Sequence, residues 1–269
     1  MTPPRLGRSD LVLSHFSLPL TTPFPERVAA AAEAGFAGIG WYVADYVRHL
    51  EQGWTDDAIL AVLREHEVVL HEVDAIRLDR MDLLEPAIHL ATLTGAHHLQ
   101  MQGDRPGTVD EAAAVISGVA DRLAPAGVGV AIEFVGNTNV TSAADALELA
   151  ERTGRDAVGV QVDVWHHVRG VDDWSQLEAL PLERIASVQL DDGPIVPIDP
   201  DYRTDTVRHR CAPGEGEFDL ARFLATVHPP ASTLPLSLEV IDDDLLQLQP
   251  SVAARRIADA TRALVDSLG

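Results

Sequence analysis

The chain has a single cysteine, Cys211, among its 269 residues. One cysteine cannot form an internal disulfide, and it rules out a zinc site built from several cysteines. This scarcity is typical of a reduced, cytoplasmic setting, which we predict here. Basic residues are also scarce, with 20 Lys and Arg against 42 Asp and Glu. Because nucleic acid and anionic membranes are bound chiefly through Lys and Arg, the net charge of −22 argues against both as partners.

The apolar segment nearest the N-terminus is short. Leu11–Leu20 follows Arg5 and Arg8, but it is interrupted by Ser14 and His15, and it is too short to cross a bilayer. We therefore interpret it as the first strand rather than a signal or anchor. A Gly-x-Gly-x-x-Gly motif after an early strand is also lacking, which removes the commonest dinucleotide-binding fold.

Short apolar runs and Ala-rich amphipathic stretches alternate along the chain. The runs that indicate strands are 11–14, 38–41, 68–73, 97–101, 128–134, 157–163, 185–190 and 236–241. The stretches with helical spacing are 25–34, 55–65, 83–94, 109–123, 142–153, 174–179, 220–227 and 251–268. Eight strand–helix repeats predict an α/β fold, a single (β/α)8 TIM barrel over residues 1–269, with a doubly wound open sheet as the competitor. The long polar interval 191–217 shows no helical periodicity and predicts a functional loop.

The run Val158-Gly-Val-Gln-Val-Asp163 has the composition of a strand buried on both faces, and it ends in a carboxylate. A buried carboxylate is costly to desolvate unless a cation or a hydrogen-bond donor pairs with it. Asp163 therefore indicates either a bound cation or the simpler role of capping the next helix. In a (β/α)8 barrel, residues at such strand ends face the site that the βα loops form.

Four consecutive predicted strands carry an oxygen donor in this position: Glu133, Asp163, Gln189 and Glu239. Three carboxylates close together would repel one another, and a divalent cation resolves this conflict. For any one of them, an internal hydrogen bond or a salt bridge to a barrel arginine is the alternative. Oxygen ligands favour Mn²⁺ or Mg²⁺, with Co²⁺ and Zn²⁺ as alternatives. Zn²⁺ is less favoured because it more often recruits His or Cys.

These residues resemble the ligand set of the xylose-isomerase-like TIM-barrel superfamily. That group includes sugar phosphate isomerases/epimerases, hydroxypyruvate isomerase, inosose dehydratases and 3-dehydroshikimate dehydratases. The resemblance extends from residues 31–38 to 237–241, and its most specific parts are Asp163-Val-Trp-His166, Val188-Gln-Leu-Asp-Asp-Gly-Pro194 and Arg210-Cys-Ala-Pro-Gly-Glu-Gly-Glu-Phe-Asp219. It implies that Arg210 and His166 contact the substrate, and that homo-oligomers are common.

Two positions depart from the family pattern. The second strand usually ends in a glutamate, whereas Gly38-Ile-Gly-Trp41 has none, so we expect Trp41 to wall the pocket. The strand-three arginine of the dehydroshikimate dehydratases is replaced by His71-Glu-Val-Asp74. This replacement argues against a carboxylated ring as substrate, and Glu72 is expected to contact the substrate instead.

The expected chemistry is proton abstraction beside a carbonyl group that the metal polarises. We predict that Glu133 and Glu239 act both as ligands and as the acid/base pair, and that Asp163 and Gln189 act as ligands only. His166 is predicted to hydrogen-bond the substrate or shuttle a proton. The favoured activity is isomerisation or epimerisation of a small sugar or keto-polyol. The alternatives are a lyase acting on a cyclic keto-acid and a non-catalytic binding barrel, whereas the acidic charge argues against a nuclease.

Overall fold

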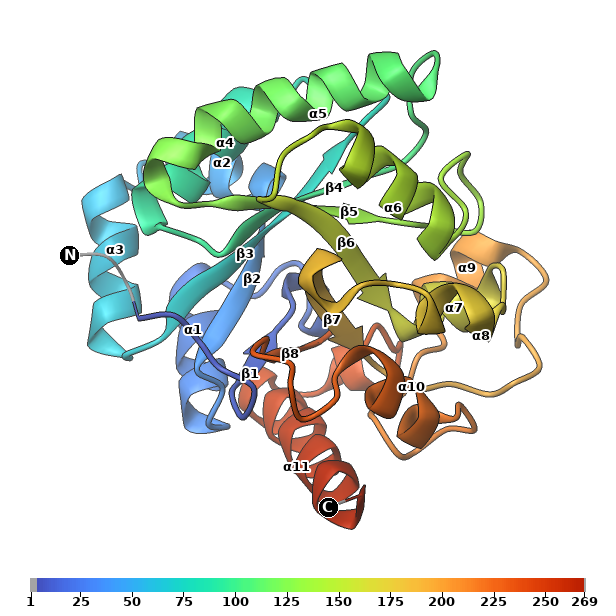
Figure 1. Ribbon diagram of the computed structural model, residues 1–269. Coiled ribbons are helices and arrows are strands. Elements are labelled where there is room, and N and C mark those ends of the chain that lie inside the picture. The colour runs from blue at the N-terminus through green and yellow to red at the C-terminus, as the bar shows by residue number, and fades with distance from the viewer. Residues whose placement is uncertain (1–3, 269) are drawn as a thin grey trace.

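A computed structural model describes residues 4–268, and these form a closed barrel of eight parallel strands in sequence order (Figure 1). The fold class predicted from the alternation is therefore confirmed. The strands are β1 Leu11–Leu13, β2 Gly38–Tyr42, β3 Val69–Arg77, β4 His98–Gln102, β5 Gly129–Glu133, β6 Val158–Asp163, β7 Ile185–Leu190 and β8 Leu236–Leu238.

Helices surround the barrel, and those that follow strands pack their apolar faces against it (Figure 1). They are α1 Phe24–Glu33, α2 Val43–Glu51, α3 Asp56–Glu65, α4 Leu84–Thr94, α5 Val109–Leu123, α6 Ala143–Arg152, α7 Val164–Arg169, α8 Trp174–Glu178, α9 Tyr202–Thr206, α10 Leu220–Val227 and α11 Pro250–Leu268. Residues 4–268 also contain four 3₁₀ turns: η1 His15–Ser17, η2 Ala124–Ala126, η3 Leu182–Arg184 and η4 Leu245–Gln247.

Local signals fix several helix ends. Thr108 and Ser142 both form capping boxes. In each, the capping side chain accepts a hydrogen bond from the backbone N–H three residues later, and the acidic side chain at that later position accepts from the backbone N–H of the capping residue. Gly95 ends α4 with φ at +64°, a conformation that costs glycine little. These helices therefore begin and end within a residue or two of their expected bounds.

Three helices were not expected from the sequence. The short helices α2 and α7 start directly after β2 and β6, without the polar break that usually separates strand from helix. The third, α9, lies inside the interval 191–217, so the expectation of no helix there is corrected. It is a single turn capped by Asp201, whose side chain accepts from Thr204 N, and it is too short to show periodicity.

Successive side chains of a strand point alternately to the apolar layer under the helices and to the barrel interior. In β6, Val158, Val160 and Val162 belong to the apolar cluster, while Gln161 and Asp163 make polar contacts inside the barrel. In β2, Trp41 packs among helix side chains, whereas Gly40 faces β3 carboxyl groups in the interior. Polar side chains of β3 and β6 therefore lie inside the barrel.

Asp192 fastens the long loop after β7. Its Oδ2 accepts from Gly214 N and Gly216 N, both at 3.0 Å, and its Oδ1 accepts from Gly193 N and Phe218 N at 2.8 and 3.0 Å. A Cβ at Gly216 would lie 2.3 Å from Asp192 Oδ1, so glycine is required there for the backbone to approach. Asp192 thus joins the Asp-Asp-Gly segment at the end of β7 to the Pro-Gly-x-Gly segment further along the loop.

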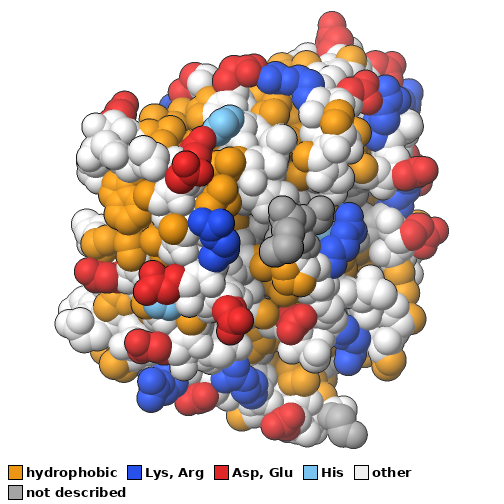
Figure 2. Space-filling view, turned by 90° about the vertical axis from the view of Figure 1, so that its left-hand side faces the viewer, with side chains coloured by type: hydrophobic (Ala, Val, Ile, Leu, Met, Phe, Trp, Pro, Cys, Tyr) orange, Lys and Arg blue, Asp and Glu red, His pale blue; other side chains and the backbone are white. Residues whose placement is uncertain are grey.

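The outer surface is mixed in character. On the face shown in Figure 2, acidic and basic side chains are interspersed with apolar ones. No helix within residues 4–268 combines the length and the apolar character that a membrane span needs.

Candidate active site

Six buried carboxyl groups and one buried guanidinium group meet in the barrel interior. The carboxyl groups belong to Glu72, Asp74, Glu133, Asp163, Asp191 and Glu239, all at most 6% exposed, and the guanidinium belongs to Arg210, at 1%. Among residues 4–268, no other Lys or Arg forms an ion pair with any of the six. Such an excess of acid over base can be stabilised only by protons or by a bound cation.

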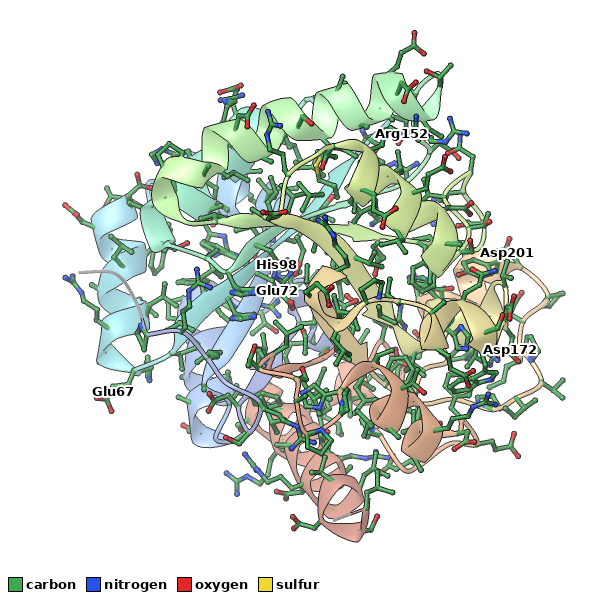
Figure 3. The ribbon with its side chains drawn as sticks, in the orientation of Figure 1. Glu67, Glu72, His98, Arg152, Asp172 and Asp201 are labelled. Atoms are coloured by element: carbon green, nitrogen blue, oxygen red, sulfur yellow. The ribbon has the colours of Figure 1, made fainter. Side chains whose placement is uncertain are left out.

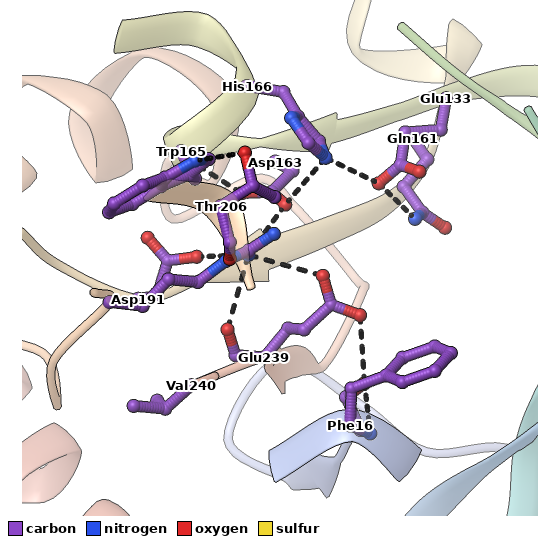
Figure 4. A network of polar contacts seen from close by, with 12 residues as sticks. Phe16, Glu133, Gln161, Asp163, Trp165, His166, Asp191, Thr206, Glu239 and Val240 are labelled. Atoms are coloured by element: carbon purple, nitrogen blue, oxygen red, sulfur yellow. Dashed lines mark hydrogen bonds and ion pairs between the residues drawn. The ribbon is translucent and has the colours of Figure 1, made fainter. Parts of the chain in front are cut away.

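Arg210 Nη1 lies where three of these carboxylates converge. It is 3.0 Å from Asp163 Oδ2 and 3.2 Å from Glu239 Oε2, and it also donates to Asp191 Oδ2. Figure 4 shows how the side chains of Asp163, Asp191 and Glu239 lie around one another. Its Nε donates to Thr206 O at 3.1 Å, which anchors the side chain from the other end. Asp163 and Glu239 thus form the salt bridge to a barrel arginine that was the alternative to a metal at these positions.

Asp163 has two roles, one for each carboxylate oxygen. Oδ1 accepts from Trp165 N at 2.7 Å and caps α7, whereas Oδ2 faces Arg210 and lies 3.7 Å from His166 Nε2. Capping and charge pairing, the two alternatives for this residue, therefore occur together. The cap also explains why a helix can begin directly at the end of β6.

Glu133 is oriented by two amide groups. Gln100 Nε2 donates to its Oε2 at 2.7 Å, and Gln161 Nε2 donates to its Oε1 at 3.0 Å. Burial and the charges of Glu239 and Asp163 raise the pKa of Glu133 well above its usual value, so a cation nearby would favour its ionised form. Gln100 and Gln161 therefore hold this carboxyl group in one orientation.

Glu239 follows β8 and is held from β1. Ser14 Oγ donates to its Oε1 at 3.0 Å, while Oε2 faces Arg210. Burial raises the pKa of Glu239 to about 7, although Arg210 opposes this shift. A carboxyl group with a pKa near neutrality can both release and accept a proton under physiological conditions.

His166 presents a nitrogen to Glu133 and Asp163. Its Nε2 is 3.9 Å from Glu133 Oε1, and one atom from each of these three residues lies within 4.8 Å of the others. Its Nδ1 is 2.7 Å from Tyr202 OH, which in turn accepts from Gly136 N at 3.0 Å. The phenol proton is thus available to Nδ1, which places the ring proton on Nε2 and makes that atom a donor toward the site. Burial lowers the pKa of His166 to about 4, so the ring is neutral.

Gln189 is fully buried, and both its Oε1 and its Nε2 are without hydrogen-bond partners within the described residues. It pairs with Asp163 and Ser237 in the strand register, so its side chain belongs to the same end of the barrel. An amide oxygen without a partner fits a hard divalent cation, as do the carboxylates of Glu133, Asp163 and Glu239. The donor set is thus compatible with the metal predicted from the sequence.

The structure corrects the prediction for Trp41. Its ring stacks on Phe24 with centroids 4.0 Å apart, and its Nε1 donates to Asp45 at 2.8 Å, so it packs between β2 and the helices. Trp41 therefore does not wall the site. Glu72 does face the barrel interior, deep in the barrel beside His98, with Glu72 Oε2 and His98 Nε2 3.8 Å apart (Figure 3).

Several supporting residues were not predicted to act at the site. Gln161 lies two residues before Asp163 on β6, so the strand period could have placed it on the same face. Tyr202 offered no comparable signal, because it reaches His166 from α9, 36 residues away along the chain. Ser14 likewise meets Glu239 only through the closure of β1 against β8.

The xylose isomerase-like TIM barrel family matches residues 28–264, most of the chain. The chain belongs to this family. Curated relatives of this barrel include a 3-dehydroshikimate dehydratase of Pseudomonas putida, 27% identical over 91% of this chain and 40% of that protein. An inosose isomerase of Halalkalibacterium halodurans is 29% identical over 56% of this chain and 53% of that protein. The chain spans about two fifths of the length of the dehydratases that it matches.

Solved structures share the fold of this xylose isomerase-like barrel. One, titled IOLI protein with a binding zinc atom, has a TM-score of 0.83 and 18% identity, and covers 97% of this chain and 99% of that one. A fusion of a xylose isomerase-like TIM barrel with 4-hydroxyphenylpyruvate dioxygenase has a TM-score of 0.80 and 22% identity, covering 96% of this chain and 42% of that one. At these identities the likeness shows the fold alone.

Proposed function

We propose that this barrel is a divalent-metal-dependent isomerase or epimerase of a small sugar or keto-polyol. The observation that carries the proposal is the imbalance of six buried carboxyl groups against one buried guanidinium group. Glu133, Asp163, Gln189 and Glu239 would hold the metal, and Mn²⁺ or Mg²⁺ suits these oxygen donors, with Co²⁺ or Zn²⁺ as alternatives. A bound divalent cation supplies a Lewis acid that polarises a substrate oxygen.

The side chains of the site can move a proton between two faces of a substrate. Glu133, oriented by Gln100 and Gln161, is suited to remove a proton from the carbon beside a carbonyl group. Glu239, with a pKa near 7, is suited to return it to the same or the neighbouring carbon. Return to the neighbouring carbon gives isomerisation, and return to the opposite face of the same carbon gives epimerisation.

Two further residues are suited to bind substrate oxygens. His166 offers its Nε2 proton, because Tyr202 occupies Nδ1. This tautomer favours a substrate contact over metal ligation by His166, although the atom lies within reach of Glu133 and Asp163. Arg210 has its Nε and Nη1 engaged, whereas no partner of Nη2 occurs among residues 4–268, so Nη2 remains available for a substrate oxygen.

The alternative is a lyase similar to the 3-dehydroshikimate dehydratases. The alternative is favoured by the extent of the sequence match, because 91% of this chain aligns with one such enzyme. The same side chains serve that reaction if the second proton goes to a departing hydroxyl group, which leaves as water. The choice between the two depends on the groups that line the substrate, not on those that move the proton.

Deuterium exchange tests the proposal directly. Mn²⁺-loaded protein is incubated in D₂O with an inosose or a ketose, and incorporation at the carbon beside the carbonyl is followed by NMR. We expect incorporation by the wild type and its loss in Glu133→Gln and Glu239→Gln, while the exposed Glu85→Gln serves as a matched control. Efficient formation of protocatechuate from 3-dehydroshikimate, without exchange into polyols, would establish the lyase instead.

A further inference from the structure

Two carboxyl groups of β3 lie in the barrel interior beside the proposed metal ligands. Asp74 is fully buried, and neither of its oxygens has a hydrogen-bond partner within the described residues. Glu72 is equally buried; its Oε1 accepts from Ser237 Oγ at 2.7 Å, whereas its Oε2 has no such partner. Buried polar atoms without partners are rare in native structures, and these three oxygens face the interior that also contains Glu133 and Glu239.

The absence of a side chain at Gly40 creates the space for these groups. A Cβ at Gly40 would lie 2.7 Å from both Asp74 Oδ2 and Glu72 Oε1. Gly40 pairs with Glu72 in the register of β2 and β3, so both carboxyl groups lean across β2. The second strand thus contributes space rather than the glutamate that the family resemblance implied, and β3 supplies the carboxyl groups instead.

The chemistry of this wall suits hydroxyl groups. A hydroxyl can donate to a carboxylate, and it can also accept from a protonated carboxyl group, whereas a ligand carboxylate can only accept. Among residues 4–268, no Arg or Lys forms an ion pair with Asp74 or Glu72, and burial lowers the pKa of His98, so that the ring beside Glu72 is neutral. A hydroxyl group is therefore matched whether or not each carboxyl group holds a proton, whereas an anionic group meets a like charge at any carboxyl group that is ionised.

We propose that Asp74 and Glu72 form the substrate wall that recognises the hydroxyl groups of an uncharged keto-polyol and rejects rings that carry a carboxylate. This inference rests on the proposed function, since it assumes that substrate binds at the metal end of the barrel. It narrows the substrate class to neutral polyols and disfavours the dehydroshikimate-like alternative.

Equilibrium binding tests the wall separately from turnover. Mn²⁺-loaded protein is titrated by calorimetry with myo-inositol and with shikimate, two hydroxylated rings of which only the second carries a carboxylate. Neither has the ketone that the proposed reaction needs, so binding is measured alone. We expect inositol to bind about tenfold or more tightly than shikimate, because the carboxylate of shikimate cannot donate a hydrogen bond to this acidic wall as a hydroxyl group can.

Substitutions test whether Asp74 and Glu72 cause the preference for inositol over shikimate. Asp74→Asn should weaken inositol binding about tenfold and reduce the gap between the two rings, because one carboxyl group is lost. This variant removes a buried, unpaired acid and so should fold at least as stably as the wild type. Gly40→Ala, which crowds both carboxyl groups, should weaken inositol binding as well. Glu65→Gln, an exposed change at the end of α3, is the control and should change neither affinity.

The proposal is overturned if shikimate binds as tightly as inositol, if inositol does not bind the wild type, or if Asp74→Asn leaves both affinities unchanged. Failure of the deuterium-exchange test has a different meaning. Deuterium exchange could fail while the wild type still prefers inositol and Asp74→Asn still loses that preference. The proposal for the wall would then hold, in a barrel that binds polyols without turning them over. If exchange succeeds without that preference, the proposed function stands and the wall does not.

Discussion

Asp163 and Arg210 form a buried ion pair, with Oδ2 of the first 3.0 Å from Nη1 of the second. The other oxygen of Asp163 caps α7, so one carboxylate joins the helix start to the charged centre of the barrel. This arrangement fixes Asp163 firmly and leaves Oδ2 directed toward the interior. The two functions of the residue can therefore be separated by substitution.

Replacing Asp163 with Asn or Ala should separate the cap from the charge. Asparagine is a good capping residue, so Asp163→Asn should bind Mn²⁺ poorly yet keep most of its stability. Asp163→Ala should also bind Mn²⁺ poorly, and its free energy of unfolding should be about 1 kcal/mol lower than that of Asp163→Asn, because alanine cannot cap α7. Metal content per chain and urea unfolding measure the two effects. Equal stability of the two variants would contradict the capping role.

Replacing Arg210 with Gln should destabilise the protein strongly at neutral pH. It leaves Asp191 and Asp163 without their cation, and breaking a buried pair costs about 3–5 kcal/mol. Arg222→Gln is the control, because the exposed pair of Arg222 with Glu178 should contribute less than about 1 kcal/mol. Thermal unfolding compares them. If Mn²⁺ binds near these carboxylates, it should restore part of the loss in Arg210→Gln.

The stability of the metal-free protein should fall as the pH rises from about 5 to 8. Burial raises the pKa of Glu72 from 4.5 to about 8, so the folded state holds a proton that the unfolded chain releases. Between these two values the folded state binds more protons, and the unfolding free energy decreases with pH, by about 1.4 kcal/mol per pH unit for one proton. Urea unfolding at several pH values in EDTA measures the slope.

Glu72→Gln should make that slope shallower and stabilise the metal-free protein at pH 8. The exposed Glu85→Gln should leave the slope unchanged, since that group pairs with Arg122 at the surface. A slope that is identical in the wild type and Glu72→Gln would show that Glu72 is already ionised in the folded protein.

Replacing Asp192 with Ala should loosen the loop after β7. Four backbone N–H groups lose their acceptor, and each hydrogen bond to a charged group contributes about 1.5–3 kcal/mol before relaxation. We expect faster hydrogen exchange at Gly214–Phe218 and earlier proteolysis in this loop. Asp201→Ala, which removes only the exposed cap of α9, should have a smaller effect, confined to that turn. Unchanged exchange at Gly214–Phe218 in Asp192→Ala would contradict the fastening role.

The sequence by itself determined the barrel, because strand and helix periodicity, capping boxes and helix-ending glycines are local patterns that do not depend on distant contacts. It also indicated the end of the barrel at which Glu133, Asp163, Gln189 and Glu239 gather, since parallel strands all end on one face. The metal at that end remains a prediction. A salt bridge to an arginine was one alternative at this point, but that Arg210 Nη1 forms it could not be inferred, because this arginine arrives from a loop whose course depends on Asp192.

In β2, only the tertiary structure decided which side chain turns inward. Gly40 and Trp41 are adjacent, yet one opens space for the β3 carboxyl groups and the other packs under α1, since neighbouring strand residues face opposite sides of the barrel wall. Tyr202 reaches His166, and Ser14 reaches Glu239, only because the chain closes on itself. Contacts between residues so far apart in sequence depend on register and closure, and no local pattern encodes them.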